Sequence, residues 1–79
     1  MPTLRLFAAA REAAGTGAAE IAGSTVDDVL AEATRRFGDT FAAVLATSKV
    51  WVNGEEVPRT TAVGDNDEVA VLPPVSGGM

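Results

Sequence analysis

The 79-residue chain contains no cysteine and no histidine, and its only lysine is Lys49. The missing thiols exclude a disulfide-stabilised secreted scaffold. Without thiols and imidazoles the chain also has no Cys/His metal cluster, no thiol nucleophile and no base that titrates near neutral pH. We therefore expect no bound metal, no bound cofactor and no active site of its own. If the chain takes part in a reaction, a group other than these side chains must react.

Long apolar runs and basic runs are missing as well. No stretch approaches membrane-spanning length, and MPTLRLFAAARE has no cationic region before a long apolar one, so we expect a cytoplasmic protein with neither a signal peptide nor a membrane span. The net charge of −5 argues against nucleic acid or an anionic membrane as a partner. It suits a basic protein partner, although many soluble proteins are mildly acidic.

The first half of the chain predicts one strand and one clear helix. TLRLFA alternates as a strand with one buried face does, with Leu4, Leu6 and Ala8 inward and Phe7 on the opposite face. AAAREAA then predicts one or two helical turns that stop at a glycine, and residues 20–22 suggest a short second strand.

The clear helix begins after Thr25, whose side chain is placed to cap it, with Asp28 three residues on in a capping-box-like arrangement. It ends at Gly38, and a second helical piece is expected over residues 40–46. The expected buried stripe of the first helix consists of Val26, Val29, Leu30, Ala33 and Phe37.

The second half predicts a hairpin and a last strand. Asn53 and Gly54 lie between alternating residues, which is typical of a tight turn with positive φ at both central positions. Trp51 is expected on the face opposite the core. In DNDEVAVL the two valines point inward and Leu72 outward, and Pro73 with the next proline ends the strand.

These elements predict an α+β domain over residues 1–74, with one main amphipathic helix packed on one face of a mixed sheet, followed by a tail over residues 75–79. Phe7, Trp51 and Leu72 are expected on the sheet face away from the helix. Contiguous exposed apolar groups usually mark a contact surface. The alternative is that a loop or a short helix covers them and makes a second small core.

The tail contains Gly77 and Gly78, which carry no Cβ, so it is narrow enough to enter a channel that rejects side chains. A terminal glycine carboxylate is also the least hindered carboxylate a protein can offer for activation. The alternative is that the glycines belong to a frayed chain end and have no function.

Three segments favour a functional tail over a frayed end: LFAAAREAAG near the start, DNDEVAVL, and the ending PPVSGG. Together with the order of the elements they resemble the ubiquitin-like β-grasp sulfur carriers, most closely the small subunit of molybdopterin synthase. The resemblance runs from Leu4 to Gly78. Thiamine sulfur carriers share the fold and the two glycines, but they usually lack the FAxxRE segment.

The resemblance implies a mechanism that needs none of the missing side chains. In the family, an adenylating enzyme uses ATP and magnesium to convert the last carboxylate to an acyl adenylate, and sulfur then replaces the adenylate to give a thiocarboxylate. Applied to this chain, the resemblance implies that the reacting atom is the carbonyl carbon of Gly78. Gly77, which has no side chain, leaves room around that atom. In molybdopterin synthase the tail inserts into the large subunit. The implied partner contacts are Phe7, Arg11, Trp51, Leu72, Pro73 and Val75.

Arg11 matches an arginine of the family that could meet an acidic partner residue or cap the sheet edge. A solvated charge paired with Glu12 or Glu20 is the alternative. The chain departs from the family at Asn66, where glycine is usual, and at Met79, which follows the last glycine. Asparagine tolerates left-handed backbone, so the turn can survive.

While Met79 remains, Gly78 has no free carboxylate. We expect a protease to remove Met79 before activation; the alternative is that Met79 does not belong to the natural terminus. Three functions stay open: a carrier for molybdopterin synthase, a carrier for a cysteine, thiamine or other sulfur pathway, and a ubiquitin-like modifier that forms isopeptides.

Overall fold

The computed structural model describes residues 1–74, so the expected tail lies outside the described residues. The described chain forms three helices and a mixed sheet of five strands in the order β2-β1-β5-β3-β4, which confirms the α+β prediction. Along the chain the elements are β1 (Thr3–Leu6), α1 (Ala8–Ala14), β2 (Ala18–Glu20), α2 (Val26–Phe37), α3 (Asp39–Leu45), β3 (Lys49–Val52), β4 (Glu55–Glu56) and β5 (Glu68–Leu72).

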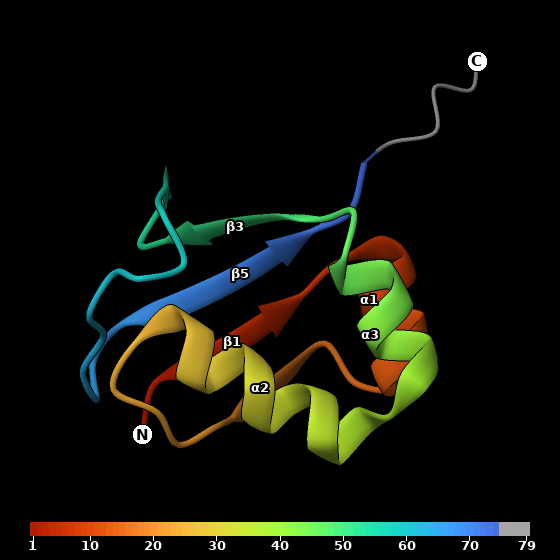
Figure 1. Ribbon diagram of the computed structural model, residues 1–79, viewed down its shortest axis with the longest axis horizontal. Coiled ribbons are helices and arrows are strands. Elements are labelled where there is room, and N and C mark those ends of the chain that lie inside the picture. Colours follow the sequence, from red (N-terminus) through yellow and green to blue (C-terminus); the bar gives the residue numbers. More distant parts are fainter. Residues whose placement is uncertain (75–79) are drawn as a thin grey trace.

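The last strand of the chain is the centre of the sheet. β5 pairs in parallel with β1, so that Leu4 lies opposite Val69 and Leu6 opposite Val71, and it pairs antiparallel with β3 on its other side. Figure 1 shows β5 running between these two strands. β2 and β4 form the two edges.

One core fills the space between the sheet and the helices. The inward residues of the strands meet the apolar stripe of α2 in a single cluster of buried side chains, which confirms the expected stripe. Phe37, at the end of that stripe, is partly buried and meets Phe41 of α3 edge to face, with ring centroids 5.3 Å apart. α3 also lies against α1 (Figure 1).

The start of α2 is capped as the sequence predicts. The hydroxyl of Thr25 accepts a hydrogen bond from the backbone N–H of Asp28 at 3.2 Å. The carboxylate of Asp28 accepts in return from the N–H of Ser24 at 3.3 Å, one residue before the expected position. The N–H groups of Val26 and Asp27 donate to carbonyl oxygens of the loop before β5, so the first turn of the helix is tied to that loop.

Three predicted elements have other bounds. The helix α3 covers Asp39–Leu45 rather than residues 40–46. The first strand ends at Leu6 rather than Ala8, because the chain leaves the sheet through Ala8, which has a φ of 50° and begins α1. The second strand covers Ala18–Glu20 rather than residues 20–22. Its pairing with β1 ends where Thr3 lies opposite Glu20. Beyond this pair, one further hydrogen bond runs from the N–H of Ile21 to the carbonyl oxygen of Pro2.

The predicted hairpin is confirmed. Asn53 and Gly54 have φ values of 51° and 89°, so both central positions of the turn are left-handed. The returning strand β4 is only two residues long and is followed by Val57 and Pro58, in agreement with the expected limit on its length.

Gly23 marks a close approach of the chain to α2. A Cβ built on this residue would lie 2.7 Å from the backbone nitrogen of Val29 and 2.8 Å from its Cγ2. We expect Gly23→Ala to lower the free energy of unfolding by about 1–3 kcal/mol, because the overpacked loop must move away from the helix. Urea denaturation would measure the change.

Gly17→Ala is the matched control. There the added Cβ would meet only the flexible side chain of Arg11, at 3.4 Å, and the stability should hardly change. Equal stability of the two variants would contradict the close packing of Gly23.

Candidate functional site

The face of the sheet that turns away from the helices carries a row of side chains in register. Arg5 of β1 lies opposite Ala70 of β5, and Ala70 lies opposite Trp51 of β3. In the next outward row Leu72 lies opposite Lys49. Phe7 follows directly after Leu6, the last paired residue of β1. We call this face the open face and define it by these six residues.

The open face stays accessible over the described residues. Phe7 is 44% exposed and Trp51 is 37% exposed, while Leu72 is half-buried. None of these three belongs to the buried cluster between the sheet and the helices. Within residues 1–74 no loop or helix buries Phe7 or Trp51 in a second core, so the alternative raised from the sequence is wrong for these two residues. Their contact with a partner stays a prediction.

Charged groups surround this apolar strip. The guanidinium of Arg5 donates from Nε to Oε2 of Glu68 at 2.9 Å, and both side chains are about half exposed. Lys49 is exposed, and in the described part of the chain no carboxylate forms an ion pair with it. This face therefore presents the ion pair of Arg5 with Glu68 and the positive charge of Lys49, which no carboxylate among residues 1–74 neutralises.

β5 fixes where the tail begins. Val69 and Val71 are fully buried, so the strand is held by the core as well as by two neighbouring strands. After Leu72 come Pro73, which is half-buried, and Pro74, which is exposed. Neither proline can donate to the ladder. The remaining predicted site residues, Val75, Gly77 and Gly78, lie outside the described residues, as does Met79.

A polar clamp holds the other end of β5. The amide of Asn53 donates from Nδ2 to Oδ1 of Asp67 at 2.9 Å and accepts from the N–H of Glu68 at 2.9 Å. The second oxygen of Asp67 accepts from the N–H of Gly64 at 2.8 Å. The hydrogen bond from Asn53, followed by that from Gly64, lowers the pKa of the Asp67 carboxyl.

The turn before β5 does not need the glycine that is usual in the family. Asn66 does not have a positive φ, since among the residues described only Ala8 and Asn53 combine a side chain with a positive φ. The replacement at this position therefore puts no strain on the turn.

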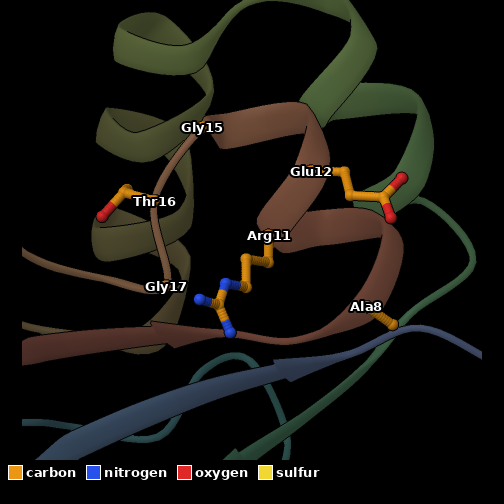
Figure 2. A pocket seen from close by; sticks show the side chains of 6 residues that line it. All are labelled: Ala8, Arg11, Glu12, Gly15, Thr16 and Gly17. Carbon is orange, nitrogen blue, oxygen red and sulfur yellow. The ribbon is translucent and has the colours of Figure 1, made fainter.

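Arg11 lies apart from the open face, on α1. It lines an open recess together with Ala8, Glu12 and the loop from Gly15 to Gly17, and Figure 2 shows its side chain extended along Gly17 while Glu12 points away. Arg11 is exposed, and no ion pair joins it to Glu12 or Glu20 in the described structure, so the pairing named in the alternative is wrong. Its contact with an acidic partner residue stays a prediction.

The described residues hold no group of three or more side chains that could bind a metal ion. None of the described helices is both long and apolar enough to cross a membrane.

Comparison with known families identifies the chain. Residues 4–78 match the ThiS family, so the match includes both glycines of the tail. The chain belongs to the ThiS family. It is a ubiquitin-like sulfur carrier, and its mixed sheet and helices form the β-grasp fold that the sequence predicted.

Several solved structures share this fold. Small archaeal modifier protein 1 of Methanosarcina acetivorans is 31% identical, with a TM-score of 0.86 over 96% of this chain and 94% of that one. A Pyrococcus furiosus protein provisionally assigned as molybdopterin converting factor subunit 1 is 30% identical, with a TM-score of 0.80 over 92% and 95%. A chain of the Amycolatopsis orientalis BexX/CysO complex is 25% identical, with a TM-score of 0.84 over 99% and 100%.

Two features of the site were not predicted. These are the ion pair of Arg5 with Glu68 and the position of Lys49 beside Leu72. Both follow from the strand register, since Lys49 lies opposite Leu72 once Val50 and Val71 are paired as inward residues. The alternation of buried and outward residues in 49–52 and 68–72 was the sequence pattern from which this pairing could have been predicted.

The Asp67 clamp predicts how stability depends on pH. A carboxyl whose folded pKa is lowered contributes stability above its unfolded pKa, near 4, and that stability is lost as the pH falls through the lower folded value. Asp67→Asn should be less stable at pH 7, because its amide cannot accept from both donors, and it should lose less stability than the parent between about pH 5 and pH 2. Urea denaturation across this range would measure both effects.

Asp65→Asn is the control, since Asp65 contacts only the α-amino group of Met1 among the described residues, and both groups are largely exposed. If the two variants showed the same pH dependence, the clamp would not be the source of the effect.

Proposed function

We propose that this ThiS-family protein carries sulfur as a thiocarboxylate on Gly78 and delivers it as the small subunit of a molybdopterin synthase. The observation that carries the proposal is that the family match runs through Gly78, while the described fold ends in a central strand that leads directly to this tail. The chain acts in the cytoplasm and is not an enzyme by itself. It provides the acyl group and a docking surface, and its partners provide the catalytic groups.

The activation requires a leaving group, because a free carboxylate does not exchange oxygen for sulfur unaided. The Gly78 carboxylate attacks the α-phosphorus of ATP, forming the acyl adenylate and releasing pyrophosphate. A sulfur nucleophile supplied by the partner then attacks the carbonyl carbon and AMP leaves. ATP and magnesium belong to the adenylating enzyme. Before this, a protease must remove Met79, because only then is the carboxylate that of Gly78.

The open face is proposed as the surface on which these partners dock. Phe7, Trp51 and Leu72 offer exposed or half-buried apolar area beside the base of the tail, and Pro73 continues that surface. Arg11 provides a cation on α1, and Val75 lies at the start of the tail. Tryptophan is enriched among the residues that dominate binding energy, which favours Trp51 as an anchor of this surface.

A second candidate is a carrier for another sulfur-accepting enzyme, as in cysteine or thiamine formation. The similarity to a chain of the BexX/CysO complex, over nearly the whole of both chains, favours it. Conjugation as a ubiquitin-like modifier is a third, less favoured candidate, supported by the similarity to small archaeal modifier protein 1. The partner separates these functions: a pterin-binding large subunit supports the first, another sulfur acceptor the second, and isopeptide adducts on target lysines the third.

The intact mass of the untagged protein, purified from its own cells, tests the carrier function. We expect loss of the Met79 residue, with part of the sample heavier by the exchange of one oxygen for sulfur. A sample that stays at full length even under high sulfur demand would show that Gly78 is never exposed, and the carrier proposal would fail.

A substitution on the open face tests the docking surface. Leu72→Asp should weaken binding to the adenylating enzyme by about tenfold or more, because a charge replaces an apolar contact at the base of the tail. The fold should survive, since Leu72 is outside the buried cluster. Titration calorimetry and circular dichroism would measure the two effects.

Ala31→Asp adds the same charge on the exposed side of α2 and should leave binding unchanged. Equal losses for both variants would attribute the effect to net charge. Unchanged binding of Leu72→Asp would refute docking at this position.

A further inference from the structure

The turn between β3 and β4 contains a side-chain amide next to a glycine. Asn53 and Asn66 carry the only side-chain amides of the chain, which has no glutamine. An asparagine loses its amide when the backbone nitrogen of the following residue attacks the side-chain carbonyl carbon. This attack is least hindered when the following residue is glycine, which has no Cβ. Asn53 precedes Gly54, whereas Asn66 precedes the larger Asp67.

The attacking nitrogen of Gly54 is free. Within residues 1–74 its N–H donates to no backbone carbonyl, and the two hydrogen bonds of the Asn53 amide go elsewhere. Asn53 and Gly54 are both exposed. Apart from chain neighbours, no atom lies within 4 Å of the position that a Cβ on Gly54 would take. Water therefore reaches the turn, and no packed side chain shields it.

The side chain under attack, in contrast, is held at both ends of its amide by the polar clamp. Nδ2 of Asn53 donates to Oδ1 of Asp67 at 2.9 Å, and Oδ1 of Asn53 accepts from the N–H of Glu68 at 2.9 Å. The backbone N–H of Asn53 also donates to the carbonyl oxygen of Glu68, at 3.0 Å. Attack would make Cγ tetrahedral and turn Nδ2 into a leaving group, so the two side-chain hydrogen bonds have to break.

We propose that Asn53 is a site of spontaneous deamidation and that the clamp with Asp67 sets the rate. The nitrogen of Gly54 gives its proton to solvent and bonds to Cγ of Asn53. The Cγ–Nδ2 bond breaks, and Nδ2 takes up a proton from water and leaves as ammonia. Water then opens the cyclic imide at one of its carbonyls. Opening at Cγ gives aspartate, and opening at the main-chain carbonyl gives isoaspartate, so that amide and water become carboxylic acid and ammonia.

Either product removes the clamp. A carboxylate at residue 53 has no N–H to donate to Asp67, and it stands at hydrogen-bond distance from a group of the same charge. Isoaspartate also lengthens the backbone of a turn whose two central residues both have positive φ. β3 ends at this turn and carries Trp51, which is paired with Glu56 of β4, so the change reaches the open face.

Opening of the clamp is a local event. The returning strand β4 consists of two exposed residues, so the turn can open without unfolding the core. A chain whose clamp stays closed keeps its amide, and each opening exposes the amide to attack. The product does not revert, so modified chains accumulate with time. Neither a partner nor the tail takes part, and the inference is independent of the proposed function.

Ageing of the purified full chain at neutral pH tests the proposal. Peptide mapping would separate asparagine, aspartate and isoaspartate at residue 53. In urea, where the clamp is open, deamidation of Asn53 should be at least about tenfold faster than in the folded protein. Asn66 should react more slowly than Asn53 in urea, because a side chain follows it.

Asp67→Ala removes the acceptor of Nδ2, and the folded variant should deamidate about fivefold faster or more. Asp65→Ala is the matched control. It removes the same charge from the same loop, but Asp65 contacts only the α-amino group of Met1 among the described residues, so the parent's rate should be kept. Gly23→Ala strains the packing against α2 instead of the clamp and should also keep that rate while circular dichroism shows a folded chain.

Four results would overturn the proposal. Equal rates in the folded and the urea-unfolded parent would show that the clamp gives no protection. An unchanged rate in Asp67→Ala would show that Asp67 does not restrain the amide, and a lower rate would show that its carboxylate promotes the reaction. Equal acceleration in Gly23→Ala and Asp67→Ala would assign the rate to global unfolding.

Discussion

The parallel pairing of β5 with β1 is the constraint on which the rest of the structure depends. It brings the last strand of the chain into the middle of the sheet, where β3 bonds to its other side. Val69 and Val71 are fully buried there, so the segment next to the tail is among the best packed in the molecule. A reactive terminus can thus begin at a rigid point, and a partner that binds the sheet also fixes where the tail starts.

The two faces of the sheet have separate tasks. The helices and the cluster of buried hydrophobic side chains found in residues 1–74 lie on one face and hold the fold together. The open face contributes little to that core, which leaves Phe7, Trp51 and Leu72 available for a partner without loss of stability. This division shows how a chain of 79 residues can have a stable core and still leave apolar side chains exposed on one face of its sheet.

Most of the fold could be predicted from local sequence patterns. The capped helix, the Asn53–Gly54 turn and the inward valines of β5 depend on residue type and spacing, and all three are confirmed. The errors at Ala8 and β2 have another origin. The residue type alanine does not predict the left-handed backbone of Ala8. The extent of β2 depends on where its partner strand begins.

The site was less predictable, because it depends on pairing between distant segments. The outward direction of Trp51 and Leu72 follows from alternation alone. The position of Lys49 beside Leu72 depends on the register of two strands. The lack of an ion pair to Arg11 within residues 1–74 depends on the path of α1. The chemistry of the tail was indicated by the two glycines and by the family resemblance, and no property of the domain itself revealed it.

A small domain with an apolar sheet face is at risk of stacking edge to edge into larger assemblies. Both edges of this sheet limit that risk. β4 consists of two exposed glutamates, and β2 has only three residues, of which the last is Glu20. An approaching edge of the same kind would meet like charges over a very short ladder. Both edges are therefore poor templates for adding a further strand, whereas the open face is not protected in this way.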